Sequence, residues 1–391
     1  MTIQTRPAVK ILVVDDEPDL EPLMLQRFRR QIRDGEMRFV FARDGREALS
    51  KLEDDLEIEL VLSDINMPVM DGLALLAALN EMPRLLKTVM VSAYNDMLNI
   101  RIAMNRGAYD FVTKPIDFDD LETTVRKTFR ELDTLREARK TRVQLDEIHA
   151  ELAVAAAIQQ SLLPLPLGED SSLDVAAMML PARHVSGDFY DYFHIGDKHF
   201  GFVMGDVAGK GIPAALFMAV ARTVLRAQAF QGATPDQCLS AVNRVLLPQG
   251  AAETYVTLFY GILDLESGKL VWTTGGHTPP WIVPADGLAR QLKNNCSFMV
   301  GMFEEACFEC AETTIHPGDT IIVYTDGITD AENPKGEMFG KVRLSALIRD
   351  IHEASAAAMT GRIVETIRDF TAGAPQADDI TLLAVRFNGR Q

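Results

Sequence analysis

The segment from Asp119 to Leu163 contains neither Gly nor Pro, and it restricts the fold more than any other feature of the sequence. Residues recur in it at alternating spacings of three and four, which is the periodicity of a coiled coil. They form two series: Val125, Thr128, Leu132 and Leu135, then Leu145, Ile148, Leu152 and Ala155. At 391 residues the chain is too long for one ordinary core, so this segment is predicted to be a helical linker between two domains.

The ends and the centre of the linker, 119–163, are marked by composition. Pro164 and Pro166 end the helix, and the charged stretch from Arg136 to Arg142 interrupts its apolar seam. An apolar seam needs a partner surface, and the same helix of a second chain is the simplest one. The sequence therefore favours a homodimer through the linker over the alternative, an amphipathic helix packed on its own domain.

Composition excludes several classes of protein. Hydrophobic residues make up 47% and charged residues 24%, which is typical of a folded globular chain. No apolar stretch is long enough to span a membrane, and Met1 to Lys10 lacks a signal-peptide run, so we expect a cytoplasmic protein without membrane contact. The formal net charge is -17, and no Lys/Arg-dense segment offers a basic face, so nucleic-acid binding is not expected.

The N-terminal part alternates short apolar strands with helical patterns, for example at Glu47–Glu53 and Leu73–Asn80. The predicted strands are Val9–Val14, Phe39–Ala42, Leu60–Leu62, Thr88–Val91 and Tyr109–Val112. This alternation predicts an α/β doubly wound domain with a parallel five-stranded sheet. In such sheets ligands bind beyond the carboxyl ends of the strands.

Reactive side chains stand at those predicted strand ends: Asp15, Asp16, Asp64, Ser92 and Lys114. Three carboxylates in one place repel each other unless a cation lies among them, and Mg²⁺ prefers carboxylate and carbonyl oxygens. One carboxylate can then attack a phosphoryl group to give an aspartyl phosphate. A lysine and a hydroxyl can stabilise the phosphoryl oxygens during the transfer.

These residues resemble the response-regulator receiver family over 8–130. The motifs that carry the resemblance are Val14-Asp15-Asp16-Glu17, Ser63-Asp64-Ile65-Asn66-Met67-Pro68, Met70-Asp71-Gly72, Ser92-Ala93 and Lys114-Pro115. The resemblance implies that a histidine kinase or phosphotransfer protein phosphorylates Asp64. It implies Mg²⁺ bound by Asp15, Asp16, Asp64 and the Asn66 carbonyl, and switch roles for Ser92, Lys114 and Phe111. An ordinary core position is the alternative for Phe111.

After Pro166 the pattern changes to successive strands with few helices. The predicted strands include Phe200–Met204, Val256–Leu263, Leu270–Thr274, Thr320–Tyr324 and Ile380–Phe387. The predicted helices are Ile212–Phe230, Pro235–Leu246, Lys341–His352 and Ser355–Phe370. The pattern predicts an α+β domain over 167–391, an antiparallel β-sandwich flanked by helices.

Acidic residues beside glycines mark four places in this second domain. They lie in Ser186-Gly187-Asp188, Gly205-Asp206-Val207-Ala208-Gly209-Lys210-Gly211, Thr325-Asp326-Gly327 and Asp378-Asp379-Ile380-Thr381. Four carboxylates from separated strands can hold two metal ions about 3.5–4 Å apart. Metal ions lower the pKa of bound water toward about 7, which supplies a nucleophile for hydrolysis of a phosphomonoester.

The acidic motifs are similar to the PPM-type metal-dependent phosphatases of the SpoIIE/RsbU branch, over about 153–388. Further motifs of the resemblance are Ile158-Gln159-Gln160-Ser161-Leu162-Leu163-Pro164, Pro213-Ala214-Ala215-Leu216 and Gly275-Gly276-His277-Thr278-Pro279-Pro280. The resemblance implies two Mn²⁺ or Mg²⁺ ions. Asp206 would bridge them, Asp188 and the Val207 carbonyl would complete one, and Asp326 and Asp378 the other. Of the adjacent residues Asp378 and Asp379, Asp379 is the less favoured metal ligand.

Two positions depart from the pattern of the resembled family: Lys210, and Ser186, which stands where a Gly is common and where little effect is expected. Lys210 stands where many relatives have His, so a histidine general acid is not expected there. His277 lies in a Gly/Pro turn, where a structural role is favoured over a catalytic one.

Taken together, the two resemblances predict a response regulator in which Asp64 phosphorylation controls a metal-dependent protein serine/threonine phosphatase. The implied substrate is a phosphorylated STAS-domain antagonist of an anti-sigma factor, in a partner-switching pathway. The alternatives are a catalytically silent adaptor that binds a sigma or anti-sigma factor, which would be expected to lack the metal carboxylates, and a phosphate sink in which only the receiver reacts.

Overall fold

The computed structural model describes residues 8–93, 97–168, 172–247, 254–286, 288–293, 298–351 and 355–389. Residues 1–7, part of the segment predicted to lack a signal peptide, lie outside the described residues, as does His352, the predicted end of one helix. The chain divides into two compact units, Met1–Asp146 and Glu147–Gln391. Each unit has its own sheets and cores.

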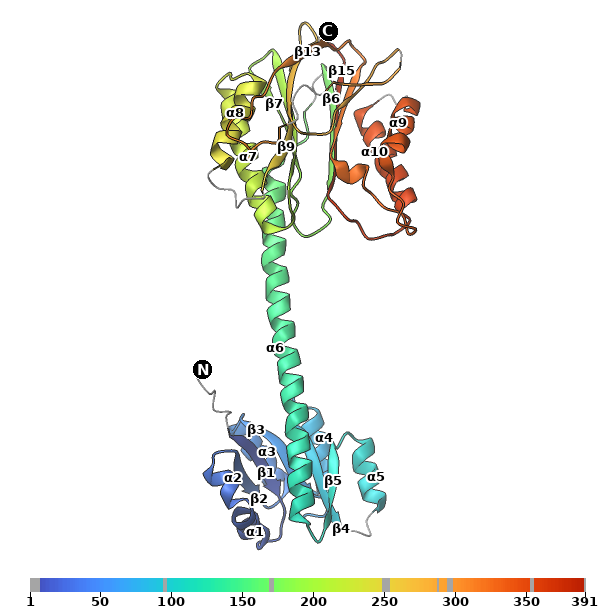
Figure 1. The fold of residues 1–391 in the computed structure, drawn as a ribbon. Coiled ribbons are helices and arrows are strands. Elements are labelled where there is room, and N and C mark those ends of the chain that lie inside the picture. The colour runs from blue at the N-terminus through green and yellow to red at the C-terminus, as the bar shows by residue number, and fades with distance from the viewer. Residues whose placement is uncertain are drawn as a thin grey trace. The chain divides into compact units, whose positions relative to one another are not determined.

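The first unit is a parallel sheet covered by helices (Figure 1). Its described strands lie in the order β2-β1-β3-β4-β5, which confirms the predicted α/β fold. The strands are β1 (Val9–Val14), β2 (Met37–Ala42), β3 (Ile58–Asp64), β4 (Lys87–Ala93) and β5 (Asp110–Lys114). The helices before the linker are α1 (Leu20–Arg27), α2 (Arg29–Arg33), α3 (Gly45–Asp54), α4 (Gly72–Asn80) and α5 (Met97–Asn105).

Both faces of this sheet are buried, because consecutive strand residues point to opposite faces. On β1, Ile11 and Val13 pack with α1 and the first turns of α6, whereas Leu12 and Val14 pack with α3 and α4. Near-continuous apolar strands such as β1 follow from this burial. The arrangement leaves the carboxyl edge of the sheet for polar side chains.

The predicted linker is one helix, α6 (Phe118–Leu162). Leu121, Val125, Phe129 and Leu132 recur at helical spacing and are buried in the core of the first unit. All ten residues of 141–150 are exposed. Among the described residues no helix is long and apolar enough to cross a membrane.

The second unit contains two antiparallel sheets, β13-β10-β9-β8-β7 and β12-β11-β14-β15-β6, within its described residues. The strands of the first are β7 (Phe189–Ile195), β8 (His199–Val207), β9 (Val256–Asp264), β10 (Lys269–Gly275) and β13 (Ala311–Thr314). Those of the second are β6 (Leu173–Leu180), β11 (Trp281–Val283), β12 (Arg290–Gln291), β14 (Thr320–Tyr324) and β15 (Ile380–Phe387). The predicted β-sandwich is confirmed.

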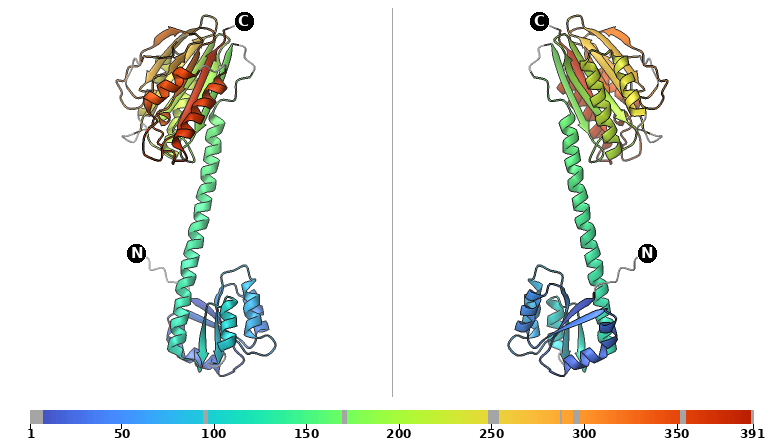
Figure 2. Two further views of the ribbon diagram at one scale, coloured as in Figure 1. Left: turned by 90° about the vertical axis from the view of Figure 1, so that its right-hand side faces the viewer. Right: turned by 90° about the vertical axis from the view of Figure 1, so that its left-hand side faces the viewer.

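Helices cover the outer faces of the sandwich. Figure 2 shows α9 (Gly340–Asp350) and α10 (Ala356–Thr371) in front of one sheet in its left view. Its right view shows α7 (Ile212–Phe230) and α8 (Pro235–Leu246) in front of the other. Phe202 and Phe259 of one sheet and Val323 and Leu383 of the other meet in a core between the sheets. Two further cores lie beneath the helix pairs.

Candidate functional sites

The first site lies at the carboxyl edge of the parallel sheet, where β1, β3 and β5 end. Asp15 directly follows β1, while Asp64 and Lys114 are the last residues of β3 and β5. The Lys114 Nζ lies 2.7 Å from Asp64 Oδ2, 2.9 Å from Asp15 Oδ2 and 2.9 Å from Glu17 Oε1. The topology thus brings together three of the predicted residues and adds Glu17.

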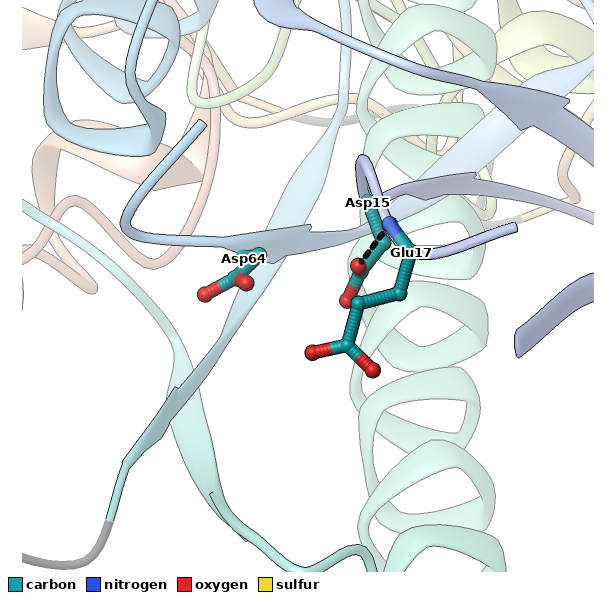
Figure 3. A group of neighbouring side chains, drawn as sticks. All are labelled: Asp15, Glu17 and Asp64. Carbon is teal, nitrogen blue, oxygen red and sulfur yellow. Dashed lines mark hydrogen bonds between the residues drawn. The ribbon is translucent and has the colours of Figure 1, made fainter. Parts of the chain in front are cut away.

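Asp15, Glu17 and Asp64 form a group whose potential ligand atoms all lie within 4.8 Å of one another. Figure 3 shows Asp15 and Glu17 beside each other and Asp64 next to them, with the Glu17 N–H donating to Asp15 Oδ1 at 2.9 Å. Oxygen ligands of this kind suit Mg²⁺, so the residues fit the predicted cation. Asp16 is exposed and outside this group, so its role as a ligand stays a prediction.

Burial and charge act on this site in opposite directions. Burial raises the pKa of the Asp15 carboxyl, and Lys114 offsets part of that rise. Burial alone would lower the pKa of Lys114, but hydrogen bonds to Asp64, Glu17 and Asp15 raise it above its ordinary value. Lys114 is therefore charged at neutral pH and partly neutralises the three carboxylates.

The remaining predicted receiver residues lie around this centre. Ser92 is fully buried in β4, and its hydroxyl has no hydrogen-bond partner among the described residues, so it is available to a ligand oxygen. The Asn66 N–H donates to Asp64 Oδ1 at 3.4 Å. Phe111 is half-buried against the cluster that contains Met90 and Ile100, a position compatible with either predicted role.

The Asp71-Gly72 pair explains part of the motif after β3. The Asp71 side chain accepts from the Ala74 N–H at 2.7 Å and so caps α4. A Cβ atom at Gly72 would lie only 2.1 Å from the main-chain oxygen of Asp64. Only glycine therefore lets α4 begin this close to the predicted phosphorylation site.

The second site is formed by the four predicted carboxylates of the second unit. Asp188 directly precedes β7, Asp206 lies within β8, Asp326 begins the 3-10 helix η2 (Asp326–Ile328), and Asp378 precedes β15. Burial, followed by the charges of Asp326 and Asp378, raises the pKa of Asp206 to about 7. Burial and then the charge of Asp206 raise the pKa of Asp188 well above its ordinary value. The carboxylates are close enough to disfavour each other's ionisation.

Two threonines orient Asp188. Its Oδ2 accepts from Thr325 Oγ1 at 2.7 Å and from Thr381 Oγ1 at 2.6 Å. Thr325 and Thr381 lie at the ends of neighbouring strands, and the Thr325 N–H donates to the Thr381 carbonyl at 3.1 Å. The carboxylate is only 2% exposed, so these bonds also compensate its loss of solvent.

Asp379 has a different task from its neighbour Asp378. Its carboxylate accepts from the Ala182 N–H at 2.7 Å, the Gly187 N–H at 2.8 Å and the Ser186 hydroxyl at 2.8 Å. A Cβ atom at Gly327 would lie 1.9 Å from the Asp379 carbonyl oxygen, so this approach also requires glycine. Asp379 thus binds the loop before Asp188, which supports the preference for Asp378 as the ligand.

The donor set of the second site fits divalent cations. Buried carboxylates that raise one another's pKa lack compensating charge, and hard divalent ions supply it. The Val207 carbonyl oxygen lies 3.0 Å from the Cβ position of Gly187, so it faces the loop that carries Asp188. Within the described residues no three of these carboxylates have ligand atoms within 4.8 Å of one another, as the receiver group does.

Lys210 lies at the rim of the carboxylates, and His277 is buried in its turn. The Lys210 Nζ is 3.2 Å from Asp378 Oδ1, and both side chains are about half exposed. His277 is 2% exposed, and its Nδ1 lies 2.9 Å from Thr257 Oγ1. Burial lowers the pKa of His277 to about 3, so the ring is neutral near pH 7 and serves the packing of its turn.

Sequence reasoning missed several residues that support the two sites. Glu17 stands in the motif Val14-Asp15-Asp16-Glu17, but the sequence predicts no role for it. Thr325 and Thr381 stand in the acidic motifs, where only the aspartates are predicted to act.

Comparison with known proteins divides the chain in the same way. The family model of the response regulator receiver domain matches residues 11–126. The model of stage II sporulation protein E (SpoIIE) matches residues 196–388. The structure is similar to the SiaA-PP2C domain of Pseudomonas aeruginosa, with a TM-score of 0.55 and 24% identity over 62% of this chain and 98% of that domain. At this identity the likeness shows the fold alone.

Two curated proteins show how far the likeness extends in sequence. Protein IcfG of Synechocystis sp. is 32% identical over 61% of this chain and 42% of its own length. Phosphoserine phosphatase RsbU of Bacillus subtilis is 28% identical over 61% of this chain and 71% of its own length. The chain thus matches less than half of IcfG and about seven tenths of RsbU.

Proposed function

Because the chain joins a response-regulator receiver domain to a SpoIIE-family PPM phosphatase domain, we propose that it is a protein serine/threonine phosphatase controlled by phosphorylation of Asp64. The observation that carries the proposal is the electrostatic effect of the second unit's carboxylates on one another: beside burial, Asp326 and Asp378 raise the pKa of Asp206, and Asp206 raises that of Asp188. A catalytically silent adaptor would be expected to lack these carboxylates. Their retention favours hydrolysis over binding alone.

The chain's own residues define what this site can do. Thr325 and Thr381 fix Asp188, and Asp379 fixes the loop before it, so the ligand oxygens are held in place before substrate arrives. Two Mn²⁺ or Mg²⁺ ions held by Asp188, Asp206, Asp326, Asp378 and the Val207 carbonyl would supply a water nucleophile of lowered pKa. Water and a phosphomonoester then give inorganic phosphate and the free hydroxyl of serine or threonine.

The receiver is proposed to supply the control. Lys114, whose Nζ lies 2.7 Å from Asp64 Oδ2, and Ser92, whose buried hydroxyl has no partner among the described residues, are the proposed donors to phosphoryl oxygens on Asp64. The proposed ligands of Mg²⁺ are Asp15, Asp64, Asp16 and the Asn66 carbonyl. The phosphoryl donor would be a histidine kinase or a phosphotransfer protein. Because such kinases use ATP, the reaction belongs in the cytoplasm.

The proposed substrate is a phosphoserine or phosphothreonine on a small STAS-domain protein that antagonises an anti-sigma factor. The likeness to the phosphoserine phosphatase RsbU supports a phosphoserine in the substrate. A phosphorylated STAS-domain protein should therefore be dephosphorylated faster than a generic phosphoserine peptide of equal concentration. Equal rates on both would argue against a dedicated STAS partner.

A homodimer through α6 completes the proposal. Val143, Leu145, Ile148 and Val154 are each at least half exposed, so the helix carries apolar surface that a second copy would cover. Changing Ile148 and Leu152 to Glu should yield monomers in light scattering and abolish the effect of phosphorylation on the phosphatase rate. A monomeric wild type that still responds to phosphorylation would exclude the dimer.

The central experiment measures phosphate release from a phosphoserine peptide with Mn²⁺ or Mg²⁺, with and without a small phosphoryl donor. The wild-type chain should be active with metal, and its rate should change with the donor. Asp64→Asn should remove that change and the acyl phosphate, seen as a mass increase of the intact chain, while keeping metal-dependent activity. A wild-type chain that is inactive with every metal would favour the adaptor. If the phosphoryl donor still changed the rate of Asp64→Asn, Asp64 would not be the phosphorylated residue.

A further inference from the structure

One residue of α6 is buried in a stretch that is otherwise solvent-accessible. Gln159 is 6% exposed, whereas its neighbours Ile158 and Gln160 are both exposed, Ile158 by 60%. A glutamine side chain loses conformational entropy and solvent when it is buried, so its burial requires compensating hydrogen bonds. Those bonds show where α6 is attached to the second unit.

Both polar ends of the Gln159 side chain bond to the main chain of one residue. Its Nε2 donates to the Ser186 carbonyl at 2.6 Å, and its Oε1 accepts from the Ser186 N–H at 2.9 Å. This paired arrangement fixes both the position and the orientation of one peptide segment, as a neighbouring strand would do. Ser186 stands two residues before the ligand Asp188.

Ser186 is in turn bonded to the carboxylate site. Its hydroxyl donates to Asp379 Oδ2 at 2.8 Å and accepts from the Asp188 N–H at 3.0 Å. Ser186 is fully buried, so water does not compete for these bonds. A continuous series of hydrogen bonds therefore runs from α6 through Gln159 and Ser186 to Asp188 and to Asp379, the neighbour of Asp378.

From this series we infer that Gln159 is a positioning residue for the carboxylate site, which it bonds directly to the helix that follows the receiver. The inference rests on the proposed function and adds the contact through which the linker acts. Gln159 touches neither substrate nor a ligand atom. It holds the Ser186 main chain, and so sets the place of the Asp188 carboxylate between Thr325 and Thr381. A rotation or withdrawal of α6 would break both Gln159 bonds at once.

The test compares Gln159→Leu with Gln160→Leu in the full chain. Leucine is close to glutamine in size but can neither donate nor accept, and Gln160 is the exposed neighbour that serves as a matched control. Gln159→Glu is the intermediate variant, because it keeps an acceptor for the Ser186 N–H but places an oxygen against the Ser186 carbonyl. An Asp15→Asn background keeps the receiver site from contributing to metal titrations.

Two readouts do not depend on catalysis. Hydrogen exchange of the peptide that contains Ser186 and Gly187 should rise about tenfold or more in Gln159→Leu, because these amides lose a fixed partner or neighbour. Calorimetric titration of the metal-stripped chain with Mn²⁺ should show affinity weakened about 10–100-fold. Gln159→Glu should fall between Gln159→Leu and wild type, and Gln160→Leu should match wild type in both.

The outcomes separate this inference from the proposed function. Wild-type exchange and Mn²⁺ affinity in Gln159→Leu would overturn the inference while leaving a phosphatase. If Gln159→Leu does not fold, Gln159→Glu decides by the same two readouts, and failure of both to fold would assign Gln159 to core stability and overturn its positioning role. A wild-type chain that binds no Mn²⁺ in the second unit would instead overturn the proposed function.

Discussion

The chain contains two acidic sites, and they differ in where the compensating positive charge lies. In the receiver, Lys114 reaches into the group and contacts Asp15, Glu17 and Asp64 within 3 Å. In the described part of the second unit Lys210 contacts only Asp378 among the four carboxylates, and this contact lies at the exposed rim of the site. One site thus contains a cation of the chain, whereas the other has a lysine only at its rim among the described residues.

This difference suits two kinds of phosphoryl chemistry. A carboxylate that accepts a phosphoryl group needs a fixed positive charge that moves from carboxylate to phosphoryl oxygen, and Lys114 is placed for that exchange. Hydrolysis by an activated water needs metal ions with open positions, and a lysine among the ligands would displace them. The four following predictions test this contrast, from the largest expected effect to the smallest.

Asp206→Asn should have the largest effect. It removes a carboxylate from the centre of the uncompensated site, and phosphate release should fall on the order of 10³-fold, about 4 kcal/mol of transition-state stabilisation. The assay is release of phosphate from a phosphoserine peptide with Mn²⁺. Asp369→Asn, an exposed change on α10, should leave the rate unchanged. Full activity of Asp206→Asn would mean that the acidic site is not the catalytic one.

The metal-free phosphatase domain should lose stability as pH rises from about 4 to about 7. The folded-state pKa of Asp206 is raised from 3.8 to about 7, so the folded chain keeps a proton that the unfolded chain has released. Each pH unit in this window then costs up to about 1.4 kcal/mol, and the total is a few kcal/mol. Mn²⁺ should stabilise more at pH 8 than at pH 5.

Calorimetric melting in EDTA across this pH range checks the effect. Asp206→Asn should flatten the dependence of the phosphatase transition on pH, and the receiver transition serves as the internal reference. A metal-free domain that grows more stable between pH 4 and pH 7 would show that the carboxylates are already compensated within the chain.

Lys114→Met should destabilise the receiver by about 1–3 kcal/mol, because it leaves the two buried carboxylates of Asp15 and Asp64, and the exposed one of Glu17, without their cation. Mg²⁺ should restore much of this loss, since it supplies the same charge. The measurement is urea unfolding of the full chain with and without Mg²⁺. Lys127→Met removes an exposed ion pair with Asp110 and should change the free energy of unfolding little. An equal loss of stability in both variants would show that Lys114 does not compensate the carboxylates of the receiver site.

Lys210→Ala should have the smallest effect. Its pair with Asp378 is about half exposed on both sides, and such pairs contribute below about 1 kcal/mol. The phosphatase rate at saturating Mn²⁺ should therefore stay within about fivefold of wild type. A loss of phosphatase rate close to that of Asp206→Asn would indicate that Lys210 takes part in the reaction. The second site would then use a lysine of the chain, as the receiver site uses Lys114.

Much of the fold followed from the sequence because its patterns are local. The alternation of strands and helices, the strand-end acidic motifs and the Gly- and Pro-free linker all correspond to described elements, such as β1 (Val9–Val14) and α6. Asp15, Asp64 and Lys114 could be brought together because parallel strands share a carboxyl edge. The same rule could not predict that Glu17 rather than Asp16 lies beside Asp15 and Asp64. Both residues follow the end of β1, where the regular alternation of side chains between the two faces of the sheet no longer applies.

The supporting contacts could not be predicted, because they depend on how distant elements pack. Thr325 and Thr381 meet through the register of β14 and β15. Gln159 and Ser186 are 27 residues apart in the chain, and nothing in an exposed helix pattern marks which glutamine turns inward. The distinction between Asp378 and Asp379 likewise rests on the three donors that surround Asp379.

The two glycines that follow aspartates, Gly72 and Gly327, set limits on how this chain can vary. Each lies directly against a carbonyl oxygen of a functional aspartate, Asp64 in one domain and Asp379 in the other. Substitution of either glycine by alanine would displace the end of the neighbouring strand, although every reactive side chain of the site would still be present. A mutational survey should therefore find both glycines as intolerant of substitution as the aspartates, and this intolerance alone would misidentify them as participants in the chemistry.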